Sequence, residues 1–230
     1  MSLKKKGADI QCKVNIEKIE GNSVFYADAK GNPCTASADR ILVAAGRRAN
    51  IEGLFADGFS VETGRGIIGD ESGKTSVGNI YVIGDAKAGN IQLAHVAEAQ
   101  ALNVIDVIQG RKPSIDVSVI PSCVYTNPEI ASVGLTERQA KEQGLEVTAR
   151  KVLTGSNGKS VIEEAESGYV KVVLDHDQRI IGAQMVCPHA TELISEMTLL
   201  VQQKMTISQL RETVHPHPTV AEMIGELARL

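Results

Sequence analysis

The chain has 230 residues, 43% of them hydrophobic and 23% charged, and its formal net charge is −4. These values are typical of a globular protein with room for one large domain or two small ones. Lys4-Lys5-Lys6 is the only dense cationic run, and no basic stripe of the kind that binds nucleic acid follows it. No apolar stretch approaches the roughly 20 residues that span a membrane, and nothing resembles a signal peptide. We therefore expect a cytoplasmic protein that binds neither nucleic acid nor a membrane.

Cysteine usage gives no sign of a metal site. Cys12, Cys34, Cys123 and Cys187 stand singly, without a CxxC pair or another metal-ligand spacing. Scattered cysteines of this kind are usually buried small hydrophobes. Trp is absent and aromatic residues make up 3% of the chain, so the core must be aliphatic.

A hairpin is the first predicted element. Residues 10–16 alternate apolar and polar side chains, which predicts a strand, and residues 23–27 predict a second one. Gly21-Asn22 supplies the turn between them, and residues 30–33 form another turn.

Two apolar runs and a helix follow. The continuous runs at 40–45 and 79–83 predict strands buried on both faces. Residues 50–78, rich in glycine and polar residues, predict loops and short strands. Apolar residues at helical spacing predict a helix over 92–109, and residues 113–121 resemble a domain boundary.

The remaining residues predict an α+β unit. Its predicted strands lie near 117–125, 145–153, 169–175 and 179–187, with a hairpin turn at 175–178. Its predicted helices begin at the capping box Thr136–Gln139, near 190–204, at Thr206 and at about Pro218.

The last sixteen residues hold a candidate acid–base pair. His217 stands just ahead of a predicted helix, and Glu222 follows five residues later. Histidine exchanges protons near neutral pH, and a nearby carboxylate can fix its tautomer. Thr219 to Glu222 also has the pattern of a capping box, so Glu222 could simply cap the helix.

A second candidate site follows the run at 79–83. Gly84 allows a close backbone approach, and Asp85 stands where the strands of α/β sheets present ligand-binding groups. Gln92 to His95 opens a helix whose free N–H groups favour negative charge. The spacing alone slightly favours an ordinary strand–turn–helix connection.

Four motifs together resemble the pyridine nucleotide–disulfide oxidoreductase family. They are Ala44–Asn50, Asn79–His95, Tyr125–Glu137 and His215–Glu222. Ala45 and Ala49 replace the family's usual Thr and Pro. The paired histidines of the last motif resemble the dihydrolipoamide dehydrogenase branch.

The resemblance implies a domain plan. Residues 1–45 would end a nicotinamide-binding domain, 46–114 would form the second segment of an FAD-binding domain, and 115–230 would form a dimerisation domain. The expected fold class is therefore α+β, with a carboxyl-terminal α+β dimerisation domain preceded by partial α/β nucleotide-binding segments. The implied protein is a homodimeric flavoprotein that uses FAD and NAD to oxidise dihydrolipoamide or a lipoyl-bearing protein.

The resemblance also implies roles for particular residues. His217 would be the acid–base residue, reaching into the partner subunit's active site, and Glu222 would orient it. His215 would have a structural or supporting role. The cofactor-binding residues would be Gly46, Gly84, Asp85, Leu93, Ala94 and His95, with His95 acting through its backbone.

Parts of the family pattern are missing. Gly64 to Gly69 has the letters GxGxxG, but neither a buried strand nor a helix flanks it, so we interpret it as a loop. No two cysteines have the family's CxxxxC spacing. We therefore expect the carboxyl-terminal half of such an enzyme, inactive alone. The alternatives are a catalytically inert dimerisation module and a part of another reductase, such as a glutathione reductase-like enzyme.

Overall fold

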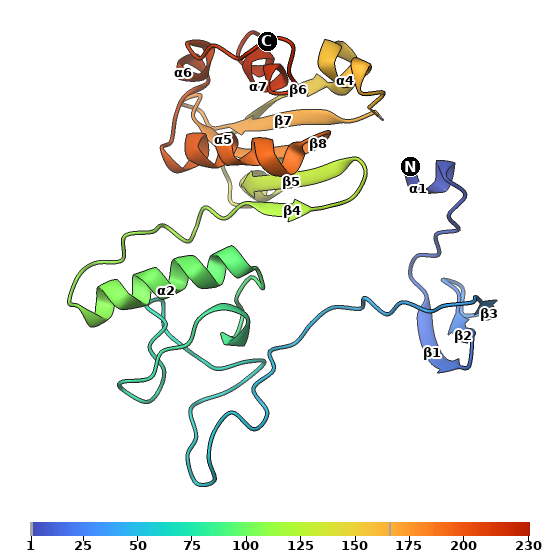
Figure 1. The fold of residues 1–230 in the computed structure, drawn as a ribbon, viewed down its shortest axis with the longest axis vertical. Helices are drawn as coiled ribbons and strands as arrows, with labels where there is room; N and C mark the ends of the chain where they lie inside the picture. Colours follow the sequence, from blue (N-terminus) through green and yellow to red (C-terminus); the bar gives the residue numbers. More distant parts are fainter. Residues whose placement is uncertain (1, 166) are drawn as a thin grey trace. The chain divides into compact units, whose positions relative to one another are not determined.

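The computed structural model describes residues 2–165 and 167–230, and it divides the chain into two compact units at Arg47 (Figure 1). The first unit contains α1 (Ser2–Lys5) and an antiparallel sheet of order β1-β2-β3. Its strands are β1 (Asn15–Glu20), β2 (Ser23–Ala27) and β3 (Pro33–Ser37). The predicted hairpin is therefore present, although its first strand begins at Asn15 instead of residue 10.

The predicted strand at 40–45 is wrong. The segment contains no strand, and Leu42 and Val43 are exposed to 91% and 68%. An apolar run becomes a buried strand only when neighbouring strands bond to its backbone. Within the described residues, no strand pairs with this segment.

The second unit begins with loops and one long helix. The run at 79–83 is also not a strand: Tyr81 forms a single isolated bridge to Lys74, although Val82 is buried. A 3-10 turn, η1 (Gly84–Ala86), follows it, and α2 spans Ala94–Ile108. Residues 64–69 form a loop, as predicted.

A five-stranded antiparallel sheet of order β4-β5-β8-β7-β6 forms the rest of the second unit. Its strands are β4 (Ser122–Val124), β5 (Glu129–Gly134), β6 (Thr148–Leu153), β7 (Tyr169–Leu174) and β8 (Ile180–Cys187). The sequence patterns did not predict β5. The whole length of β5 pairs with the central strand β8.

Helices and turns surround this sheet. They are α3 (Glu137–Glu142), η2 (Thr154–Ser156), α4 (Gly158–Ile162), α5 (Ala190–Gln202), α6 (Ile207–Arg211) and α7 (Glu222–Leu227). Both side-chain bonds of the capping box are present at Thr136 and again at Thr206. The last helix begins at Glu222, four residues later than predicted. No described helix is long and apolar enough to cross a bilayer.

One aliphatic core holds the sheet and its helices together. Helix α5 lies along β5 and β8, and α7 packs against β6 and β7 (Figure 1). The side chains of Val170, Met185, Met197 and Ile224 are fully buried in this core. Cys187 is buried with them, and burial raises the pKa of its thiol to about 12. Cys12, in contrast, is exposed and departs from the expectation of buried cysteines.

Candidate functional site

The terminal histidines lie on the loop that joins α6 to α7. Pro216 and Pro218 alternate with them, and a proline ring fixes φ, so this loop has few conformations open to it. The buried Asn157 side chain donates a hydrogen bond to the Thr219 carbonyl at 3.0 Å. The Thr219 hydroxyl donates to the Pro216 carbonyl at 2.7 Å. The loop is thus fixed to the α4 end of the domain and to itself.

His217 and Glu222 form a hydrogen-bonded pair. His217 Nδ1 lies 2.9 Å from Glu222 Oε1 and 3.2 Å from Oε2. The His217 side chain is 80% exposed, whereas that of Glu222 is 26% exposed. A carboxylate at Nδ1 favours the tautomer with the proton on Nδ1. Nε2, at the other edge of the ring, is then a proton acceptor.

The Glu222 carboxylate also serves the helix start. Glu222 Oε2 accepts the Thr219 backbone N–H at 3.0 Å. This bond, followed by the bond from His217, lowers the pKa of the Glu222 carboxyl. The Thr219 hydroxyl turns instead to Pro216, so only one arm of the predicted capping box forms. Glu222 therefore joins His217 to the turn that precedes α7.

His215 lies in different surroundings from His217. Its side chain is only 8% exposed, and its Nε2 lies 3.0 Å from Glu196 Oε1 on α5. Sequence reasoning missed Glu196, because nothing in the spacing of residues 196 and 215 links the two side chains before the chain folds.

The second group of predicted residues lies around η1 and the start of α2. Gly84 has φ +60, and a Cβ there would lie 2.7 Å from the Cβ of Ala97, so only glycine fits between η1 and α2. The Gly84 N–H donates to Gln100 Oε1 at 2.8 Å, and Asn90 Nδ2 donates to the Gly84 carbonyl at 2.9 Å. Asp85 follows at an exposed position.

The start of α2 presents backbone N–H groups. Leu93 is the N-cap, with extended backbone and no side-chain cap, and α2 continues from Ala94 for 15 residues. The first N–H groups of such a helix and its positive dipole end favour negative charge. His95 Nε2 lies 2.9 Å from the Pro121 carbonyl, so its side chain ties α2 to the segment before β4. Gly46, with φ +110, belongs to the first unit.

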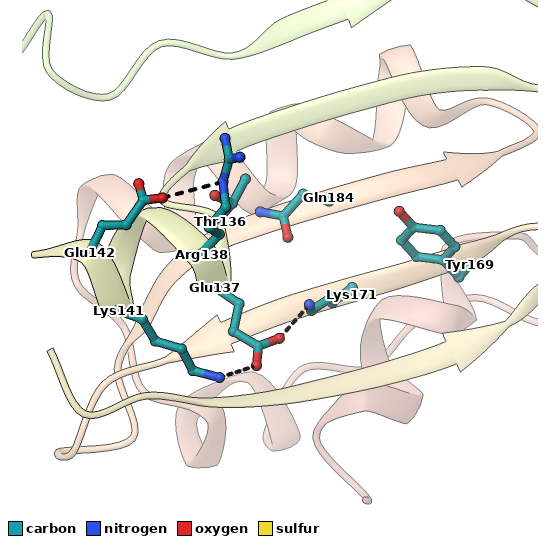
Figure 2. Close-up of a pocket in the computed structure, with 8 residues that line it drawn as sticks. All are labelled: Thr136, Glu137, Arg138, Lys141, Glu142, Tyr169, Lys171 and Gln184. Carbon is teal, nitrogen blue, oxygen red and sulfur yellow. Dashed lines mark hydrogen bonds and ion pairs between the residues drawn. The ribbon is translucent and has the colours of Figure 1, made fainter. Parts of the chain in front are cut away.

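A separate hollow of about 720 Å³ lies beside α3 (Figure 2). Glu137 lies between two lysines there, 2.8 Å from Lys141 Nζ and 2.7 Å from Lys171 Nζ. The hydrogen bonds from Lys141 and Lys171, together with the charges of both lysines, lower the pKa of the Glu137 carboxyl to about 2. The residues lining the hollow are Thr136, Glu137, Arg138, Lys141, Glu142, Tyr169, Lys171 and Gln184. Since its acids and bases are paired with one another, we assign no ligand to this hollow.

Comparison with known proteins gives two family matches. Residues 1–101 match the model of the pyridine nucleotide-disulphide oxidoreductases, and residues 120–228 match the dimerisation domain of the same family. The chain is 38% identical over 234 residues to a dihydrolipoyl dehydrogenase of Bacillus subtilis, covering 98% of this chain and 49% of that protein. It is 41% identical over 195 residues to one from Chlamydia muridarum, covering 84% and 42%. The chain thus spans about half the length of the curated relatives it matches.

Solved structures resemble the whole chain. The HOCl-induced flavoprotein disulfide reductase RclA from Escherichia coli superposes with a TM-score of 0.88 at 24% identity, covering 100% of this chain and 53% of that one. At this identity the likeness concerns the fold alone. LpdA from Mycobacterium tuberculosis superposes with a TM-score of 0.82 at 25% identity, covering 99% and 50%.

Proposed function

Because this chain belongs to the pyridine nucleotide–disulfide oxidoreductase family, we propose that it supplies the acid–base pair and the dimerisation domain of an enzyme that oxidises dihydrolipoamide with NAD. The relatives named dihydrolipoyl dehydrogenase support this substrate class. The observation that carries the proposal is the exposed His217 ring held through Nδ1 by Glu222.

In the proposed reaction His217 handles one proton. Nε2 takes the proton from a thiol of dihydrolipoamide, and the thiolate attacks a disulfide of the enzyme, because thiolate is the competent nucleophile. Glu222 holds the ring in the tautomer that leaves Nε2 free of a proton, and it stabilises the imidazolium that forms.

The residues around α2 would hold part of the flavin. Asp85 would accept hydrogen bonds from ligand hydroxyls, and the backbone of Leu93, Ala94 and His95 would face the ring. Gly84 would let the chain approach closely, and Gly46 would contribute from the preceding segment. FAD, when bound, supplies the carrier that passes electrons from the substrate thiols to NAD.

The proposal includes the expected domain plan and assembly. Residues 1–45 would complete a nicotinamide-binding domain, 46–114 would contribute to the FAD-binding domain, and 115–230 would pair two subunits. His217 would then act in the active site of the other subunit of a homodimer, on dihydrolipoamide or a lipoyl-bearing protein. The cytoplasmic location expected from composition stays a prediction.

A chimera tests the role of His217 most simply. Residues 1–230 would be joined to the amino-terminal half of the Bacillus subtilis relative, and dihydrolipoamide-dependent reduction of NAD would be measured. We expect His217→Ala to lower kcat by about 10²–10⁴-fold, as for loss of a positioned general base. His176→Ala, on the exposed hairpin, is the matched control and should leave turnover unchanged.

Other results would favour the alternatives. Equal turnover of the His217→Ala and His176→Ala chimeras would contradict the acid–base role. A dimeric chimera without flavin absorbance would favour the inert dimerisation module, and reduction of glutathione disulfide in preference to lipoamide would favour the other reductase class. Residues 1–230 alone should give no turnover.

A further inference from the structure

We propose that His215 is a positioning residue for His217, and this inference rests on the proposed function. The two residues are separated by a single proline, yet the His215 side chain is 8% exposed and the His217 side chain is 80% exposed. A ring that is 8% exposed cannot meet a substrate directly. The contacts of the His215 ring with α5 and α7 indicate a structural role.

His215 joins the loop to α5. The bond from His215 Nε2 to Glu196 Oε1, at 3.0 Å, links residues that are 19 positions apart in the sequence. Glu196 lies in the middle of α5, whose buried side is part of the main core, so the loop is tied to a rigid element. A hydrogen bond to a carboxylate is stronger than one between neutral groups.

The same ring also lies against α7. A Cβ placed on Gly225 would lie 2.7 Å from His215 Nδ1 and 3.2 Å from Cε1. Any other residue at 225 would therefore displace the ring. Glycine inside a helix is less stable than alanine, so its presence here needs a packing reason. The His215 ring supplies that reason.

These contacts define the position of His217 from both sides. His215 fixes the start of the Pro-His-Pro segment on α5 and α7, and Asn157 fixes its end through the Thr219 carbonyl. Glu222, on the first turn of the same α7, then meets His217 Nδ1. A displaced His215 would release the start of this segment and leave His217 held only through Glu222 and the Asn157–Thr219 bond. A general base loses efficiency when it is misplaced by as little as about 1 Å.

The test uses residues 1–230 as they are, with ¹⁵N-labelled histidine, and observes the ring nitrogens of His217 by NMR. In the wild type we expect the pattern of a single tautomer with the proton on Nδ1. His215→Ala and Gly225→Ala should both shift this pattern toward that of free imidazole. His215→Gln retains an N–H donor for Glu196 and should restore the wild-type pattern, and His176→Ala should leave it unchanged.

The backbone amide spectrum of the sheet shows whether each variant is folded. If His215→Ala loses that spectrum, Gly225→Ala decides the question, because alanine favours the helix. A wild-type His217 pattern in the folded alanine variants, or failure of His215→Gln to restore it, would overturn the proposal. In the chimeric enzyme we expect His215→Ala to lower kcat about tenfold with KM changed less than twofold. The NMR result does not depend on turnover, so it stands even if the proposed reaction is wrong.

Discussion

The Glu222 carboxylate accepts hydrogen bonds from two groups of the loop that precedes α7. The sequence left two interpretations open, a helix cap and a partner for histidine. Glu222 accepts hydrogen bonds from the His217 ring and from the Thr219 N–H just ahead of α7, but the N-cap of α7 is Ala221, which makes no side-chain cap bond. The Thr219 N–H and the His217 ring share the same carboxylate, and these bonds lower the pKa of its carboxyl. The carboxylate therefore remains charged well below neutral pH, which is the state that can orient an imidazole.

Glu137 gives a pH prediction at the residue scale. Its pKa falls from 4.5 to about 2, so its pairing with Lys141 and Lys171 stabilises the fold above pH 4.5 and is lost as the pH falls toward 2. Glu137→Gln should lower the free energy of unfolding at pH 7 by up to about 1 kcal/mol, since the pair is partly exposed. The difference from wild type should shrink below pH 4.5. Urea unfolding at pH 7 and pH 3 measures both.

A control lies on the same helix. Glu142 faces Arg138 at 3.6 Å with both side chains largely exposed. Glu142→Gln should therefore change stability by less than about 0.5 kcal/mol at either pH. An effect of Glu137→Gln that grows as the pH falls would contradict the assigned shift.

Among the elements, those that depend on residues close in the sequence were predicted well. Those that depend on pairing with distant segments were not. The capping box at Thr136, the helix start at Thr206 and the turn at 175–178 depend on residues a few positions apart, and all three are present. The strands expected at 40–45 and 79–83 depend on neighbouring strands, which the described residues do not supply.

In the candidate site, too, the contact between residues close in the sequence was predictable and the contact between distant residues was not. The spacing of His217 and Glu222 was visible because a single loop and helix turn brings them together. The bond between Glu196 and His215 was not, because it depends on how α5, α6 and α7 pack. Gly225, inside the last helix, was the one local signal that could have indicated a buried neighbour.

Gly182 gives a prediction for the sheet. It lies in the central strand β8, where an added Cβ would overlap the Leu135 carbonyl oxygen. Because that atom belongs to the backbone, the strand itself must move, and we expect Gly182→Ala to destabilise the fold by about 1–3 kcal/mol. Gly158→Ala, at the open start of α4, is the control and should be neutral or slightly stabilising. Equal midpoints of thermal unfolding for the two variants would contradict this packing.

At the scale of the whole molecule, the boundary at Arg47 separates two units that each have their own sheet. Residues 38–50 between them contain no helix or strand in the described structure. Brief trypsin treatment should therefore cut first after Arg40, Arg47 or Arg48 and leave a fragment that ends at Leu230. Mass spectrometry of the early products identifies these sites.

Arg150 provides the internal comparison for proteolysis. It lies in β6, and its Nη1 donates to the Leu227 carbonyl at 3.2 Å. Cleavage there requires the sheet to open, so it should come much later. Early cleavage at Arg150 would show that the sheet domain is not the stable unit described here.

Mixed dimers of the chimera test directly whether His217 acts in the active site of the other subunit, as proposed. One subunit would carry His217→Ala, and the other would lack the redox cysteines of its amino-terminal half. As a homodimer, the His217→Ala variant should have kcat lowered by about 10²–10⁴-fold, and the variant without redox cysteines should have no activity. If the histidine acts across the interface, purified mixed dimers have one complete site of two and should show about half the wild-type kcat per dimer. If it acts within its own subunit, the mixed dimers have no complete site and should be no more active than the His217→Ala parent, which would contradict the account.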